Sequence, residues 1–525
     1  MQWDIAVSHG LVSTLLISGI AAVLAPILGS VAAYGLIVVR PFGWRVAAAL
    51  LASFLLVPVY VQATAWSAGF GSQGWLRLSQ VDAAKNPWYG IAAVIWIHTA
   101  AATPYCFFIA ALGLQRARDT AYEQALVEMG PAFAFRQILF RKLFPWILAA
   151  SLWTFCSTQN DMVVTNLFQV PTLCESVYQQ VQFGKLRAVP IIASLLLAIL
   201  CGICLAVAML FRYPTQAIGD SPESSSNGHG TILPIGPGAS NVPPGTPVAV
   251  FNIRGKSLWA LGVWGIVFAT SLLPFASLIA RIGWESRIVG ERAIRSWSVE
   301  QTLRSIAHVT DFSTEFGWSF QLAIWSSGLA VALALLLIVS STISPTISST
   351  SRTFVVTTLF LLGFALSLPG PLVNLTLLQF FDRVLPDSWS FIAERTLIGP
   401  ILALQFRCLP IAYGILLLAR WGYESRYENL IATDKSLPWW LQQSIWLKYA
   451  TGSILTCLGI TFFISFGDLA SYLLIQPPGV TTVAMRMFEL LHYGIRNREA
   501  SVAMVLAIAA AIPSLWLTLR ATRDL

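Results

Sequence analysis

Three charged side chains lie inside long apolar segments of this chain, where few groups could do chemistry. Asp161 and Asp468 lie 16 and 20 residues into two predicted membrane spans, and Arg407 lies near the middle of another, three residues before Pro410. At about 1.5 Å per helical residue, both aspartates fall in the outer part of the bilayer or near its outer face. Ionisable groups inside a membrane are costly and mark pathways or buried pairs.

We interpret Asp161 and Asp468 as candidates for the lining of a transport pathway on symmetric helices, with Arg407 as a counter-charge or gate. The alternatives are that the aspartates are interfacial and cap helix ends, and that Arg407 belongs to a structural ion pair.

The elements that position these residues are predicted to be membrane-spanning helices. Of the 525 residues, 56% are hydrophobic and 11% are charged, whereas soluble domains carry about 25% charged residues. We predict an all-α polytopic membrane protein with eleven spans, because lipid cannot satisfy an open backbone. The predicted spans are 11–39, 46–66, 88–113, 146–168 and 188–211, followed by 257–280, 319–341, 354–378, 393–419, 449–475 and 501–519.

A polar stretch rich in Gly, Pro and Ser divides the chain. It predicts a flexible cytoplasmic linker at 213–256 between a first half, 1–212, and a second half, 257–525. The halves repeat short motifs in the same order, at an offset near 305 to 311 residues, which indicates an internal duplication. The matched positions include Ser18 and Ser327, Pro104 and Pro410, Tyr122 and Tyr427, Asp161 and Asp468, and Thr172 and Thr482. One extra helix before the second repeat makes the predicted repeats parallel.

The loop at residues 122–145 is polar and basic although apolar spans flank it. It reads YEQALVEMGPAFAFRQILFRKLFP. Gly130 and Pro131 interrupt two helix-prone runs, which predicts a helix-turn-helix along the inner membrane surface. An ordinary amphipathic interfacial loop is the alternative. The second copy, from Tyr427, is degenerate and has Asp434 where the first copy has Met129.

Two segments carry a resemblance to a known family. Residues 463–503 read FISFGDLASYLLIQPPGVTTVAMRMFELLHYGIRNREASVA, which resembles the last third of permeases that import ferric iron, thiamine or aminoethylphosphonate. The order Glu, Ala, Gly and then a basic, apolar stretch in 122–145 resembles the EAA loop of the same ABC-importer permeases. The resemblance covers nearly the whole chain, including its two fused permease halves.

The resemblance implies the inner-membrane component of a binding-protein-dependent transport system, with two parallel repeats of the type I ABC-importer permease fold. It implies alternating-access import of a small solute, with ferric iron foremost, and two partners: a cytoplasmic ABC ATPase dimer and an extracytoplasmic solute-binding protein. The ATPase-coupling residues that it implies are Glu123, Gln124, Ala125, Gly130 and Arg136 in the first loop and Tyr427, Glu428 and Asp434 in the second.

The chain lacks a Gly-x-x-x-x-Gly-Lys-Ser/Thr phosphate loop. We therefore expect ATP hydrolysis on a partner chain, and we expect no enzymatic activity, cofactor or metal site here. The lone His98 and the pair Cys201 and Cys204 lie within predicted spans and are interpreted as packing residues. The net charge of +8 is scattered over short loops, so lipid is an expected partner and nucleic acid is not.

Loop charge predicts the orientation in the cell (inner) membrane. The N-terminal tail carries Asp4 and no Lys or Arg, whereas the first inner loop carries Arg40 and Arg45 and the C-terminus carries Arg520 and Arg523. The positive-inside rule then places the N-terminus outside and the C-terminus in the cytoplasm.

Two other functions compete with the importer. Inverted repeats and buried acidic residues would favour an ion-gradient-driven secondary transporter. A cluster of His, Asp or Ser at one membrane face would favour a membrane-embedded enzyme. The sequence favours neither, and it does not name the substrate.

Overall fold

The computed structural model describes residues 2–71, 87–117, 120–130, 133–184, 188–210, 253–289, 292–341, 349–433, 439–493 and 497–523. The helices are α1 (Gln2–Tyr34), η1 (Gly35–Val39), α2 (Trp44–Ser53), α3 (Val59–Phe70), α4 (Pro87–Ala117), α5 (Thr120–Glu128), η3 (Ala134–Leu139), α7 (Phe140–Gln159), α8 (Val163–Leu167), α9 (Leu173–Gln182), α10 (Ala188–Leu210), α12 (Ile253–Val267), η4 (Phe268–Leu272), α13 (Leu273–Ile282), α14 (Val299–Ala307), η5 (His308–Phe312), α15 (Ser313–Ser341), α16 (Ser349–Ser367), α17 (Gly370–Val384), α18 (Asp387–Arg395), α19 (Ile398–Thr433), α20 (Trp439–Gly467), α21 (Val483–His492) and α22 (Asn497–Arg523).

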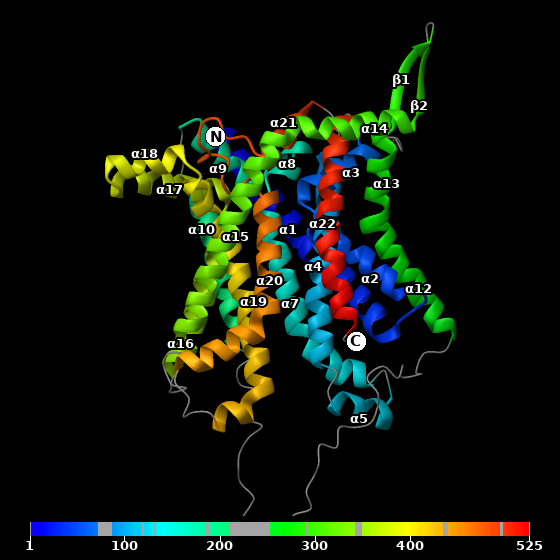
Figure 1. The fold of residues 1–525 in the computed structure, drawn as a ribbon, viewed down its shortest axis with the longest axis vertical. Helices are drawn as coiled ribbons and strands as arrows, with labels where there is room; N and C mark the ends of the chain where they lie inside the picture. Colours follow the sequence, from blue (N-terminus) through cyan, green and yellow to red (C-terminus); the bar gives the residue numbers. More distant parts are fainter. Residues whose placement is uncertain are drawn as a thin grey trace, which may run out of the picture.

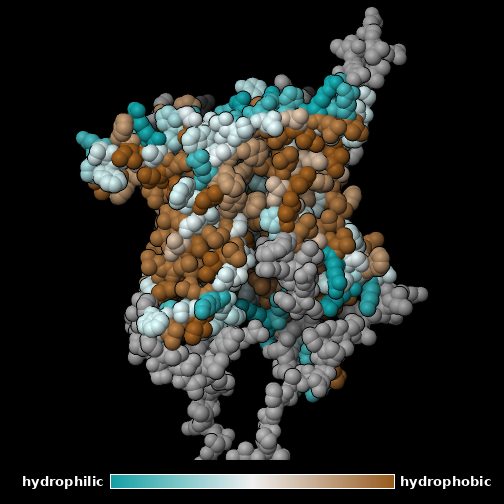
Figure 2. Space-filling view, viewed as in Figure 1, coloured by the Kyte–Doolittle hydropathy of each residue, from teal (hydrophilic) through white to brown (hydrophobic). Residues whose placement is uncertain are grey.

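The described residues form an all-α polytopic membrane protein with one small hairpin. Within the described ranges, nine helices are long and apolar enough to cross a membrane, or ten if a bent pair is counted as one span. The hairpin pairs β1 (Trp284–Val289) with antiparallel β2 (Arg292–Trp297) and extends from the upper end of the bundle in Figure 1. Hydrophobic residues cover the sides of the bundle and hydrophilic residues gather along its upper rim (Figure 2).

Four of the eleven predicted spans are not single helices over their predicted length. The predicted spans 146–168 and 449–475 stop at Gln159 and Gly467, so Asp161 and Asp468 lie in the turns beyond α7 and α20 and not inside spanning helices.

The predicted span 46–66 is broken between α2 and α3, and Pro58 precedes the first residue of α3. The predicted span 354–378 is bent by 105° between α16 and α17, where Pro369 precedes α17. Proline lacks an N–H and disfavours helical geometry in the residue before it, so each helix has to stop and restart. The same break recurs in both halves.

Several polar contacts also recur in the two halves. The backbone N–H of Leu173 donates to Thr14 Oγ1 at 2.9 Å, and that of Val483 donates to Ser319 Oγ at 2.9 Å. Thr172 and Thr482 cap the N-termini of α9 and α21. Cys106 lies 3.3 Å from Thr154 Oγ1, and Cys408 lies 3.0 Å from Ser465 Oγ. Matched contacts of this kind are expected if the two halves are duplicates.

The two halves are interlocked rather than side by side. The last helix of the first half, α10, packs against α16 of the second, and the last helix of the second half, α22, packs against α2 of the first. At the first contact Gly202 is so close to α16 that an added Cβ would lie 2.8 Å from the carbonyl oxygen of Phe360. The largest buried apolar cluster likewise joins Tyr60 and Val163 to Leu404 and Tyr472.

The loop at residues 122–145 differs in part from the predicted helix-turn-helix. Helix α5 is separate and lies at the lower end of the bundle in Figure 1. Beyond the turn, however, the chain forms one continuous apolar helix from Ala134 to Gln159, and Pro145 lies inside it rather than ending a second surface helix. In the second half the corresponding segment continues α19, whose 36 residues extend beyond the length needed for a span.

Candidate functional site

A cavity of about 140 Å³ lies between the two halves. Its walls are mostly apolar and include Tyr105 and Trp153. Four residues with acidic or basic side chains also line it: His98, Asp161, Arg407 and Asp468. Each of them comes from a different helix or helix end. All three charged residues singled out in the sequence therefore meet at one place.

Asp161 lies just beyond the end of α7 and stabilises the turn that follows. Its Oδ2 accepts a hydrogen bond of 2.9 Å from the backbone N–H of Val164, the second residue of α8. His98, from the middle of α4, places its Nε2 3.4 Å from the same oxygen. His98 is almost fully buried and Asp161 is largely buried, so the carboxylate has both a structural and a cavity-facing contact.

Asp468 occupies the matching position beyond the end of α20. Its Oδ1 accepts from the backbone N–H of Ser471 at 3.1 Å and its Oδ2 accepts from the Ser471 hydroxyl at 2.5 Å. Arg407, from α19, places its Nε 3.4 Å from Oδ2, and the two side chains are 14% and 9% exposed. Each half thus presents one aspartate that caps a turn three residues long and faces a basic side chain.

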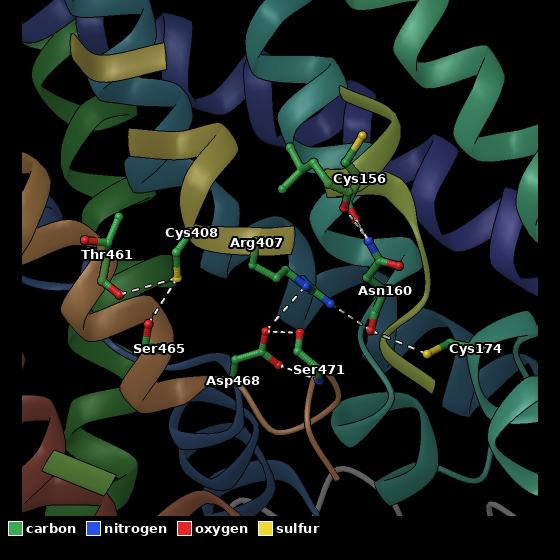
Figure 3. Close-up of polar contacts among 10 residues, drawn as sticks. Cys156, Asn160, Cys174, Arg407, Cys408, Thr461, Ser465, Asp468 and Ser471 are labelled. Atoms are coloured by element: carbon green, nitrogen blue, oxygen red, sulfur yellow. Dashed lines mark hydrogen bonds and ion pairs between the residues drawn. The ribbon is translucent and has the colours of Figure 1, made fainter. Parts of the chain in front are cut away.

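Arg407 also reaches across to the first half. Its Nη2 donates to the carbonyl oxygen of Asn160 at 3.3 Å (Figure 3). The thiol of Cys174 donates to the same carbonyl at 3.6 Å, and burial raises the pKa of this thiol to about 12, so it stays protonated. One guanidinium therefore joins a carboxylate of one half to a helix-end carbonyl of the other.

Two amides next to Asp161 make a second contact between the halves. Gln159 donates through Nε2 to the carbonyl of Ser367 at 3.0 Å, and Asn160 donates through Nδ2 to the carbonyl of Leu366 at 2.8 Å. Both acceptors lie at the end of α16, where the helix stops before Pro369. These donors satisfy carbonyl groups that a helix end leaves without a partner.

Two buried polar atoms of residues that line the cavity have no hydrogen-bond partner among the described residues: Oδ1 of Asn160 and Nε2 of His98. The His98 and Asp161 atoms are close enough for an ion pair but do not have hydrogen-bond geometry. Because buried polar groups are normally paired with protein or water, these atoms are available to a ligand or to water inside the cavity.

The predicted coupling residues of the first loop lie far from this cavity, around α5. Glu123, Gln124 and Arg136 are exposed, whereas Ala125 is buried against the bundle. Gly130 has φ of +82°, a left-handed conformation that other residues resist. The loop therefore presents an acidic helix and a basic helix on either side of a glycine turn.

The second loop is only partly described. Tyr427 and Glu428 lie in the last part of α19, where the structure describes the backbone and not the side chains, and Asp434 lies outside the described residues. The two loops nevertheless differ in backbone, because α5 is a separate helix and its counterpart is continuous with the span before it.

Several contacts around the cavity were not predicted from the sequence. His98 is almost fully buried, as expected of a packing residue, but its contact with Asp161 was not predicted, and Gln159, Asn160 and Ser367 were not singled out. The only available signal was that Gln159 and Asn160 precede Asp161 directly. Among the described residues, no group of three or more His, Cys, Asp or Glu could hold a metal ion.

No profile of a known protein family matches the chain, and no curated protein sequence matches it.

Proposed function

We propose that this chain is the membrane permease of a binding-protein-dependent ABC importer, with both permease halves in one polypeptide. The observation that carries the proposal is the cavity between the halves, lined by Asp161 and Asp468 at matching positions. A pathway at the interface between repeats is where duplicated transporters bind and pass their substrates. The recurring contacts and the recurring helix breaks support the two-half arrangement.

Alternating access would act on the contacts between the halves. A push from an ATPase on α5 would enter α7 through the glycine turn, since α7 carries the loop residues at one end and Gln159 and Asn160 at the other. Movement of the end of α7 would lengthen or break the contacts of Asn160 with Arg407 and Leu366. The halves would then rock around the cavity and open it to one side at a time.

Charge supports a cationic substrate. Two carboxylates and one guanidinium line the cavity, which leaves one net negative charge when His98 is neutral. Ferric iron, free or chelated, is the leading substrate in this proposal because of the resemblance of residues 463–503, and the described residues of the cavity form no metal-ligand cluster. The energy source and both partners, an ATPase dimer and a solute-binding protein, would be separate chains, and the α5 end would face the cytoplasm.

A secondary transporter is the second candidate, and the buried contact between His98 and Asp161 favours it. A carboxylate beside a buried histidine is typical of proton relays in gradient-driven carriers. Under this alternative a proton on this pair, rather than ATP, would drive the conformational change.

Uptake in intact cells of the native host, which retain an extracytoplasmic solute-binding protein, separates the two. Strains with the chain deleted and restored would be given radiolabelled ferric iron, either with an uncoupler while ATP is maintained or with ATP depleted while the gradient is maintained. An importer loses chain-dependent uptake only on ATP depletion. Loss of uptake with the uncoupler alone would contradict the proposal and favour the secondary transporter.

A further inference from the structure

Helices α17 and α18 form an arm that leaves the bundle. Figure 1 shows it at the upper left, at the end of the bundle away from α5. Helix α17 begins at Gly370, at the 105° bend after α16, and α18 follows it from Asp387 to Arg395. We name residues 370–395 the paddle.

The direction of the paddle follows from the bend. Helix α16 belongs to the apolar bundle and packs along α10, which is long and apolar enough to span a membrane. Spanning helices tilt by about 20° from the bilayer normal on average. A turn of 105° from such a helix brings α17 close to the plane of the membrane.

The paddle has one apolar face and one polar face. Phe380 and Val384, one helical turn apart on α17, are exposed, and Val384 is 63% exposed. Trp389, which is 60% exposed, and Ile392 are the corresponding residues of α18. The polar residues Gln379, Asp382, Asp387 and Glu394 are exposed as well. Such a division is typical of helices that lie in a membrane interface.

The surroundings identify what covers the apolar face. In Figure 2 the paddle lies where the hydrophobic side of the bundle meets the hydrophilic upper rim. The apolar residues of the paddle are therefore continuous with the surface that faces lipid. The residue types of the paddle also fit this position. Tryptophan is enriched at the level of lipid headgroups. The Cζ of Arg395 lies 4.4 Å from the centre of the Phe391 ring.

We propose that the paddle is an interfacial anchor, with Phe380, Val384, Trp389 and Ile392 inserted among the lipids of the leaflet at the end of the bundle away from α5. The partner is the headgroup and upper acyl-chain region of the bilayer. Such an anchor would form whatever the chain transports and whatever its energy source.

The base of the paddle is joined to the cavity. Gly370 lies so close to the backbone of Ala470 and Ser471 that there is no room for a side chain, and Ser471 binds the carboxylate of Asp468. On the other side, Ser367 accepts the amide of Gln159. The base of the paddle therefore touches residues that belong to the contact between the two halves.

Spin-label depth measurements test the anchor. The full chain, with Cys204→Ser to remove the exposed native thiol, would carry one label at Trp389→Cys or Ile392→Cys on the apolar face. Matched labels at Asp387→Cys and Glu394→Cys on the polar face are the controls. All four side chains are exposed, so the substitutions leave the core intact. Each variant would be placed in lipid nanodiscs, and its collision rates with oxygen and with a water-soluble nickel complex would be compared.

The anchor predicts that labels at 389 and 392 collide more often with oxygen than with the nickel complex, and that labels at 387 and 394 show the reverse. Nickel collisions that dominate at all four positions would place the paddle in water and overturn the inference. Low collision rates with both reagents at 389 and 392 would mean that protein covers the face, which would overturn it equally.

Discussion

The guanidinium of Arg407 lies between two halves of the chain: its Nε is 3.4 Å from Asp468 Oδ2, and its Nη2 donates to the Asn160 carbonyl at 3.3 Å. The first contact is within the second half and the second contact crosses to the first half. A charge that is largely buried has to remain paired. Any rocking of the halves therefore has to break the bond to Asn160 while the pair with Asp468 keeps the charge compensated.

Replacing Arg407 by Leu is expected to abolish uptake and to lower the thermal unfolding temperature, because Asp468 loses its partner. Breaking a fully buried pair costs about 3–5 kcal/mol, and the partial exposure here reduces the expected loss to about 1–3 kcal/mol. The double variant with Asp468→Asn should recover part of the stability and none of the uptake. Arg304→Leu, from the exposed pair on α14, is the control. Full uptake by a normally assembled Arg407→Leu protein would exclude a role in transport.

Two substitutions at Asp161 distinguish the effect of its negative charge from the effect of its hydrogen bond to the following turn. Asp161→Asn keeps an oxygen that can accept from Val164 but removes the charge, so we expect normal folding and uptake reduced about tenfold or more, which is about 1.4 kcal/mol. Asp161→Ala removes both and should also lose about 1 kcal/mol of stability, as for a lost cap. Thermal unfolding and initial uptake rates would be measured together. If Asp161→Asn takes up substrate at the normal rate, the residue serves only as a cap.

Glu175 is expected to make stability depend on pH. Burial raises the pKa of its carboxyl, although the amides of Asn166 and Gln179 donate to it and oppose the shift. The folded state thus binds this proton more tightly than the unfolded state, and the stability that it contributes is lost as pH rises from about 4.3, the unfolded value, through the folded pKa.

The variant Glu175→Gln should therefore gain stability relative to the wild type between acidic and neutral pH, since its amide oxygen still accepts from Asn166. Unfolding temperatures in detergent at several pH values would measure this difference, with Glu123→Gln on the exposed helix α5 as the control. A difference between variant and wild type that does not change with pH would show that burial of Glu175 has no such effect.

Because α10 packs closely on α16, we expect an alanine substitution to destabilise the protein at Gly202 but not at Gly328. Gly202→Ala places a Cβ 2.8 Å from the Phe360 carbonyl oxygen, so the two helices have to separate, and overpacking of this kind costs about 1–3 kcal/mol. Gly328→Ala on α15 meets no atom within 4 Å and should be neutral or stabilising. Unfolding temperatures of the two variants decide between these outcomes. Equal temperatures would mean that the halves are not interlocked at this contact.

Much of the fold could be predicted because lipid permits few structures. Long apolar runs had to be helices, and the positions of most spans followed from them. The breaks at Pro58 and Pro369 were missed, since a proline inside an apolar run is compatible both with a kinked span and with two separate helices. At Pro145 the error was the opposite: a helix was expected to end there, and the structure shows one helix that continues through it.

The candidate site could be predicted only through its charges. Asp161, Asp468 and Arg407 stood out because charge is rare in an apolar span, and the structure places them around one cavity. Neutral groups such as Asn160 and Ser367 gave no such signal, since their role depends on contacts between residues about 200 positions apart. The pairing of His98 with Asp161 was missed for the same reason.

Copurification of an ATPase tests the importer most directly. The tagged chain would be extracted from native membranes in mild detergent, as wild type and as Glu123→Ala plus Gly130→Arg, with Gly130→Asn as a control that tolerates the φ of +82°. If the chain is an importer permease, an ABC ATPase copurifies with the wild type and with Gly130→Asn and is lost from the double variant. Wild-type protein that retains its fold and carries no ATPase under any mild condition would contradict it.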